Sequence, residues 1–193
     1  MLRRLSVIVV ILVVAGNAGA SIGFDDFLLT GSVQYTASTL KDTNEPIDGA
    51  GIVLTIEQLG SQDPVSFGLS FAFYSMDAEN NEAGLVTKAT INSYPIYLMG
   101  RYWFGKGALQ TYLGGAFGVY FSQRSLTTVT DETHTSFGMS GTGLSVPLGL
   151  AWSVTSRVYI TANYSFNWLI DNDFLESGIV HAAGFGLGIN FGN

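Results

Sequence analysis

The chain has 193 residues, of which 24 are glycine and none is cysteine, and only 12% are charged. That charged share is about half of what a soluble domain usually carries. The absence of cysteine excludes a disulfide framework, and the formal net charge of −7 disfavours nucleic acid as a partner. The only long apolar run, residues 7–15, is too short for a membrane-spanning helix, which needs about 20 residues. Strands are therefore the expected way to arrange this one-domain, glycine-rich chain.

The amino terminus has the order of features typical of a secretory signal peptide. Arg3 and Arg4 precede the apolar run, and the small residues Ala18 and Ala20 provide a cleavage site. We predict a signal peptide over residues 1–20 and a mature domain over residues 21–193. Because no cysteine follows the cleavage site, lipid attachment there is not expected.

The mature chain alternates between two kinds of side chain in one segment after another. In residues 157–168, for example, Ile160, Phe166 and Trp168 share one parity, while Thr161 and Asn163 share the other. A period of two is typical of a strand whose two faces meet different surroundings. The pattern predicts eight strands, over residues 27–36, 51–59, 65–75, 91–104, 109–121, 137–153, 157–168 and 179–191.

The chemistry of the two faces decides which kind of sheet this is. One face is large and apolar, the other is small or polar, and the eight segments carry only three charges, Glu57, Arg101 and Arg157. A soluble barrel or sandwich would show many more charges to water. Short connections also alternate strictly with long ones, which we place at residues 38–50, 76–88, 122–136 and 169–178. These features predict an all-β, eight-stranded antiparallel transmembrane up-and-down β-barrel with both chain ends on the periplasmic side.

Aromatic side chains recur at both ends of the predicted strands, always on the apolar parity. Such rings are favoured at the level of lipid headgroups and form the two girdles of a membrane barrel. We assign Phe27, Phe104, Trp152 and Phe191 to the periplasmic girdle, and Tyr35, Phe73, Tyr94, Phe121 and Trp168 to the outer one.

Residues 94–104 (YPIYLMGRYWF), 109–118 (LQTYLGGAFG) and 184–191 (GFGLGINF) together resemble a known family. They look like strands of the small eight-stranded outer-membrane proteins of Gram-negative bacteria, the OmpX, OmpW and OmpA-barrel type. The resemblance covers the whole mature chain. It implies a place in the cell outer membrane, contact with membrane lipid and lipopolysaccharide, and insertion by the barrel-assembly machinery. An eight-stranded barrel is about wide enough for side chains to fill, so we expect a monomer.

Glu57 and Arg101 are the main chemical feature of the predicted interior. Both have the inward parity and lie a few residues from periplasmic turns. A charge inside a narrow barrel is costly unless it is paired and hydrogen-bonded. We hypothesise that the two meet across the lumen and help to plug it; alternatively, each pairs with another group or with water. Replacing Arg101 by alanine should then raise conductance or lower stability.

Catalysis requires a nucleophile or a base, and the candidates are few. His134 lies in a polar loop, His181 has the parity of the apolar face, and Ser177 belongs to no active-site motif. There is also no Gly-x-Ser-x-Gly, His-Glu-x-x-His or phosphate-loop motif. We predict no enzymatic activity, no catalytic residue, no cofactor and no metal site.

The four long connections carry 11 of the 15 acidic residues. Cation-assisted contact with a surface partner is one interpretation, and solubility of exposed loops is the other. We predict a non-enzymatic barrel with a structural or cell-surface interaction role, whose surface ligand the sequence does not name. The alternative is a narrow pore for small, even apolar, solutes, and a lipid A-modifying enzyme is the least favoured.

Overall fold

The computed structural model describes residues 27–191, apart from residues 43, 60–63, 83–84, 106 and 129–132. The predicted signal peptide lies outside this part of the chain. Within it, no helix is long and apolar enough to cross a membrane.

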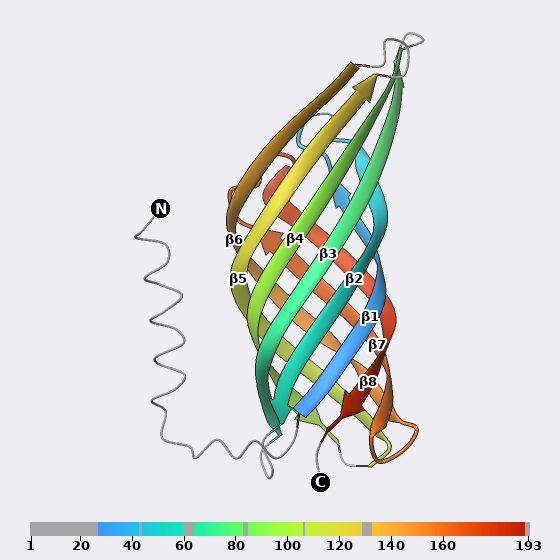
Figure 1. The fold of residues 1–193 in the computed structure, drawn as a ribbon, viewed down its shortest axis with the longest axis vertical. Coiled ribbons are helices and arrows are strands. Elements are labelled where there is room, and N and C mark those ends of the chain that lie inside the picture. The colour runs from blue at the N-terminus through green and yellow to red at the C-terminus, as the bar shows by residue number, and fades with distance from the viewer. Residues whose placement is uncertain are drawn as a thin grey trace.

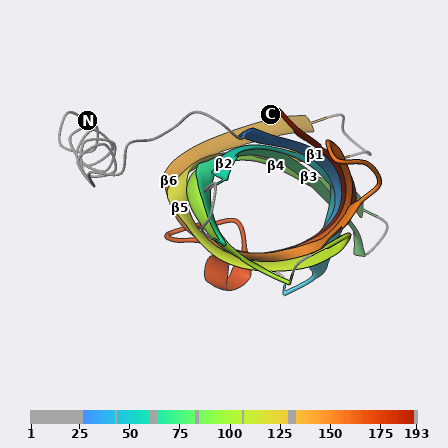
Figure 2. The same cartoon turned by 90° about the horizontal axis from the view of Figure 1, so that it is seen from below.

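Eight antiparallel strands form a closed barrel in which each strand pairs with its sequence neighbours and β1 pairs with β8. Figure 2 shows the closed ring, and Figure 1 shows how strongly the strands tilt. The predicted all-β fold with eight antiparallel strands is confirmed. The strands are β1 (Phe27–Thr39), β2 (Pro46–Leu59), β3 (Val65–Glu82), β4 (Leu85–Phe104), β5 (Leu109–Thr128), β6 (Thr133–Ser153), β7 (Val158–Leu169) and β8 (Ile179–Asn190).

The two ends of the barrel differ in height. At the end where β1 begins and β8 ends, the strands are joined by three short connections, and we call this the turn end. At the opposite end, β3 to β6 rise above the other strands, and we call this the tall end (Figure 1). These four strands have 18 to 21 residues, whereas the other four have 12 to 14.

The two faces of the wall have opposite chemistry. In the described part of the chain, thirty large apolar side chains are exposed. All of them except Phe137, near the tall end of β6, follow the outward parity of the strands, as Ile52, Leu54 and Ile56 do on β2. The inward face is small or polar, with buried Thr30, Ser32 and many similar residues. An apolar belt of this extent is far larger than a soluble protein exposes to water, and it has the pattern of a barrel surrounded by lipid.

The starts and ends of the strands agree with the sequence prediction at the turn end but not at the tall end. Residues 76–88 and 122–136, predicted as long loops, are mostly strand in β3–β4 and β5–β6. The prediction used apolar–polar alternation, and that signal disappears where a strand continues beyond the lipid and both of its faces become polar. The acidic residues Asp77 and Glu79 therefore lie on β3 rather than in a loop. The connection after β7 remains irregular, with a short 3-10 helix, η1 (Glu176–Gly178).

Candidate functional site

The turn end of the lumen contains an ion pair between Glu57 of β2 and Arg101 of β4. Arg101 Nη1 lies 2.6 Å from Glu57 Oε1, and the two side chains are 8% and 0% exposed. The Ser66 hydroxyl donates to Glu57 Oε2 at 2.7 Å, and the Trp103 indole N–H donates to Ser66 at 2.9 Å. The buried carboxylate therefore has a partner on each oxygen, as a charge in this environment requires.

The ion pair does not reach from one wall to the opposite wall by itself. Glu57 and Arg101 belong to strands that flank β3, and both side chains reach over that strand. Tyr112 of β5 extends the contacts, because the Arg101 guanidinium lies 4.4 Å from the centre of its ring. A Cβ built at Gly149 of β6 would lie 2.6 Å from the Tyr112 hydroxyl. Contacts thus run from β2 to β6, which is the opposite wall, and we name this row the turn-end network.

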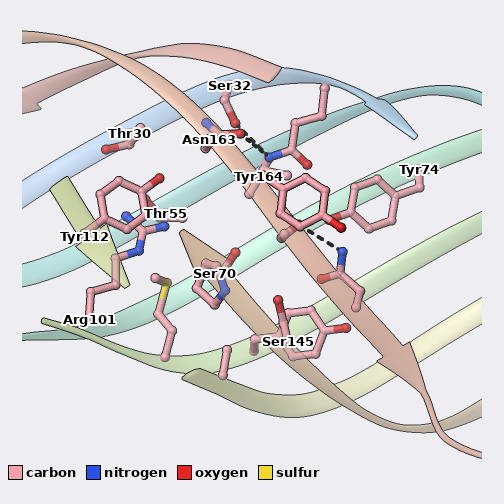
Figure 3. Close-up of a pocket in the computed structure, with 18 residues that line it drawn as sticks. Thr30, Ser32, Thr55, Ser70, Tyr74, Arg101, Tyr112, Ser145, Asn163 and Tyr164 are labelled. Carbon is pink, nitrogen blue, oxygen red and sulfur yellow. Dashed lines mark hydrogen bonds between the residues drawn. The ribbon is translucent and has the colours of Figure 1, made fainter. Parts of the chain in front are cut away.

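A small polar cavity lies further along the lumen. Its volume is about 40 Å³, which is room for a few water molecules. Figure 3 shows Thr55, Ser70, Tyr74 and Tyr112 around it. Gln34 Nε2 donates to Asn163 Oδ1 at 2.8 Å, but Gln34 Oε1 and the Tyr97 hydroxyl have no protein partner. Water is the expected partner of these two buried polar atoms.

The tall end of the lumen is closed by apolar side chains, which we name the tall-end plug. They come from six strands and from both connections beside them, so they meet across the barrel axis. Most of them are completely buried. The members of this cluster are Leu40, Ile47, Met76, Ala89, Ile91, Tyr120, Leu169, Phe174, Leu175 and Val180.

Residues 170–178 supply the part of the plug that no strand provides. The Asn172 side-chain oxygen accepts the backbone N–H of Phe174 at 2.9 Å and that of Leu175 at 3.2 Å. Leu175 also forms a β-bridge with Leu40, and the Tyr120 hydroxyl donates to the Ile170 carbonyl at 2.9 Å. These bonds fix the segment, so that Phe174 and Leu175 point into the barrel although acidic residues flank them.

The predicted girdle residues lie on the outward face at both ends. Eight of the nine have exposed side chains, and Phe27, at the start of β1, is half-buried. Phe73 and Tyr94 contact each other on neighbouring strands, with ring centres 5.2 Å apart. The girdle roles themselves stay predictions, because they concern the level of the lipid.

The histidine and serine considered for catalysis are placed as follows. His181 is exposed on the outward face of β8, where its Nδ1 lies 2.6 Å from the Tyr164 hydroxyl. Ser177 lies in η1 with an exposed side chain, and nothing in the structure joins it to His181. The side chain of His134 lies outside the part that the structure describes. Within the described part, no three histidine or acidic side chains lie close enough together to hold a metal ion.

No protein-family model matches the sequence, and no curated protein matches it either. Solved structures do match. The neisserial surface protein NspA superposes with a TM-score of 0.62 at 14% identity, covering 84% of this chain and 96% of that one. For OprG of Pseudomonas aeruginosa the TM-score is 0.57 at 16% identity, with 88% and 97% covered. For Ail of Yersinia pestis it is 0.55 at 15% identity, with 86% and 99% covered.

The likeness to these proteins establishes the fold. The chain has the architecture of the small eight-stranded outer-membrane β-barrels, in agreement with the resemblance predicted from its sequence. The match covers 96–99% of the length of each of them and 84–88% of this chain. At 14–16% identity the particular activities of these proteins do not transfer to this chain.

Proposed function

We propose that this protein is a non-enzymatic barrel of the bacterial outer membrane, closed to solutes, with a structural or cell-surface interaction role. The observation that carries the proposal is the double closure of the lumen. The turn-end network occupies one level with buried, hydrogen-bonded polar groups, and the tall-end plug occupies another with apolar side chains. The cavity between them has a volume of about 40 Å³, which is room for a few water molecules but not for a metabolite.

The fold and the apolar belt support the location in the outer membrane. In this orientation the short connections of the turn end face the periplasm, as in outer-membrane barrels, and the tall end faces outward. The four tall strands then project from the cell surface as a continuous sheet. A surface of this kind suits contact with neighbouring molecules better than passage through the barrel.

The charge of the tall end limits which surface ligands are compatible. Ail has been crystallised with a heparin analogue, sucrose octasulfate. Here the predicted outer connections contain 11 acidic residues and only Lys41, Lys88 and Arg124 as basic ones. Each of the three basic side chains is paired with an aspartate. We therefore expect no strong binding of a sulfated polyanion.

Planar-bilayer recording of the refolded mature protein tests the proposal. A heat-modifiability gel first establishes that the barrel is folded, and the folded protein should then give no discrete openings. Steady openings of the wild-type protein would refute the closed-barrel proposal. They would support the second candidate, a narrow pore, which the polar cavity with its unpartnered Gln34 and Tyr97 atoms favours.

A further inference from the structure

An open hollow lies at the tall end, outside the lumen, between the β7–β8 wall and the segment that follows β7. Its volume is about 500 Å³. Trp168, the last outward-facing residue of β7, forms one side, and its side chain is 45% exposed. The plug residues Leu169 and Leu175 form its floor, and its other lining residues belong to neither the turn-end network nor the tall-end plug.

The polar groups around the hollow come from two connections that are far apart in sequence. Lys41 Nζ lies 3.1 Å from Asp173 Oδ1, and both side chains are exposed. Asp171 and Ser177 also line the hollow and are exposed. Both have positive φ, 59° and 57°, a backbone conformation that is costly for residues other than glycine and is concentrated at functional positions.

The position of the hollow relative to the lipid indicates what could occupy it. Trp168 pairs with Ile179 and with Leu144, and below it the outward face is the apolar belt. His181, two residues after Ile179 on β8, contributes a polar group to this outward face and contacts Tyr164. The hollow is therefore continuous with the apolar outward face. With Trp168 in the outer girdle, as the sequence predicts, the hollow opens where acyl chains end and headgroups begin.

We propose that the hollow binds the sugar headgroup of a glycolipid of the same outer leaflet. The electron-rich face of the Trp168 indole attracts the C–H groups on the face of a pyranose ring. The carboxylates of Asp171 and Asp173 accept hydrogen bonds from sugar hydroxyl or amide groups, and Lys41 donates. Lys41, Asp171 and Asp173 carry a net charge of −1 together, so the recognised group is the sugar rather than an unscreened phosphate. This inference rests on the outer-membrane orientation proposed above.

The chain contains a matched control for Trp168. Trp152 is also an exposed tryptophan on the outward face, at the opposite end of the barrel, with 57% exposure. The third tryptophan, Trp103, donates its indole N–H to Ser66 inside the barrel. In a Trp152→Phe protein, Trp168 is therefore the remaining tryptophan on the outward face, and its emission reports on the hollow.

The test uses the full mature protein refolded in phosphatidylcholine vesicles, with purified lipid A added as the probe. Lipid A should change the emission of Trp168 in the Trp152→Phe protein, whereas phosphatidylglycerol, an anionic lipid without a sugar, should not. In a separate binding titration with labelled lipid A, Trp168→Leu should weaken binding about tenfold, which is the scale of a lost aromatic contact. Trp152→Leu should leave binding unchanged.

Additional variants separate sugar recognition from general membrane effects. Asp171→Asn and Lys41→Gln should each weaken lipid A binding while the heat-modifiability gel still shows a folded barrel. Equal responses to lipid A and phosphatidylglycerol, or equal effects of Trp168→Leu and Trp152→Leu, would overturn the proposal. A wild-type protein that fails to fold in vesicles, or that conducts, would instead contradict the closed outer-membrane barrel itself, so the two failures are distinguishable.

Discussion

Replacing Arg101 by alanine should strongly destabilise the barrel. The substitution removes the 2.6 Å bond to Glu57, whose side chain is 0% exposed. The buried carboxylate then keeps only two hydrogen bonds, from the Ser66 hydroxyl 2.7 Å away and from the more distant Thr55 hydroxyl. Removing one partner of a buried ion pair typically costs about 3–5 kcal/mol, because the remaining charge is uncompensated. The lost contact of the guanidinium with the Tyr112 ring adds to this.

Equilibrium unfolding in urea, with the protein in lipid vesicles, measures this loss. Arg157→Ala is the matched control, since Arg157 is exposed beside a short connection, and it should change the free energy of unfolding by less than about 0.5 kcal/mol. The double variant Glu57→Gln, Arg101→Met removes both charges and should recover most of the stability. A loss below about 1 kcal/mol for Arg101→Ala, or a double variant as unstable as the single one, would refute the reasoning.

The same variant should not conduct. The tall-end plug lies in series with the turn-end network, and its apolar side chains remain packed when Arg101 is removed. Of the two consequences that the sequence suggested for this substitution, the structure therefore favours lower stability over higher conductance. Discrete openings of folded Arg101→Ala in a planar bilayer would show that the plug does not close the barrel.

Three further predictions test the wall, the lumen and the two levels of closure. Leu148→Arg, in the middle of the exposed apolar stretch Leu144–Trp152 of β6, should cost about 2–4 kcal/mol, whereas Ser140→Arg, outward but nearer the tall end, should cost about 0–1 kcal/mol in the same urea assay. Gly149→Val introduces atoms 2.5 Å from the Ala162 carbonyl oxygen and 2.6 Å from the Tyr112 hydroxyl, and overpacking of this kind should cost about 1–3 kcal/mol. An unchanged unfolding curve would show that both neighbours can move away. Adding Leu175→Asp to Arg101→Ala should produce discrete openings in a planar bilayer that neither single variant gives. A folded double variant without openings would contradict the proposal that only the turn-end network and the tall-end plug close the lumen.

The sequence predicts the transmembrane part of the wall well because lipid on one side and a crowded lumen on the other enforce a period of two. It also places Glu57 and Arg101 on the inward face, where the cost of burying a charge suggests a partner. The remaining contacts of the turn-end network depend on strand register. Nothing in the sequence spacing shows that Ser66 aligns with Arg101 across β3–β4, or that Gly149 leaves room for Tyr112.

The tall-end plug was not predicted, although the sequence contains one signal for it. Phe174 and Leu175 are adjacent large apolar residues inside an acidic connection, where exposed apolar side chains would be unfavourable. Such a pair in a polar segment indicates that the segment folds back onto something apolar. The sequence does not identify the target of this segment, because Met76 falls in a predicted loop and Ile91 is the first residue of a predicted strand.

The tall strands depend on the plug for a hydrophobic core. Above the outward-facing Phe73, Tyr94 and Phe121, the outer face of β3–β6 turns to polar residues such as Gln123, which suit water rather than lipid. A sheet exposed on both faces has little to stabilise it. Here Ala78, Leu126 and Met139 on the inner face of the tall strands pack against the plug. The side chains that close the lumen therefore also hold the projecting sheet in place, so an open barrel and an ordered tall end are mutually unfavourable. This coupling supports the proposed role at the outer surface over the alternative of a narrow pore.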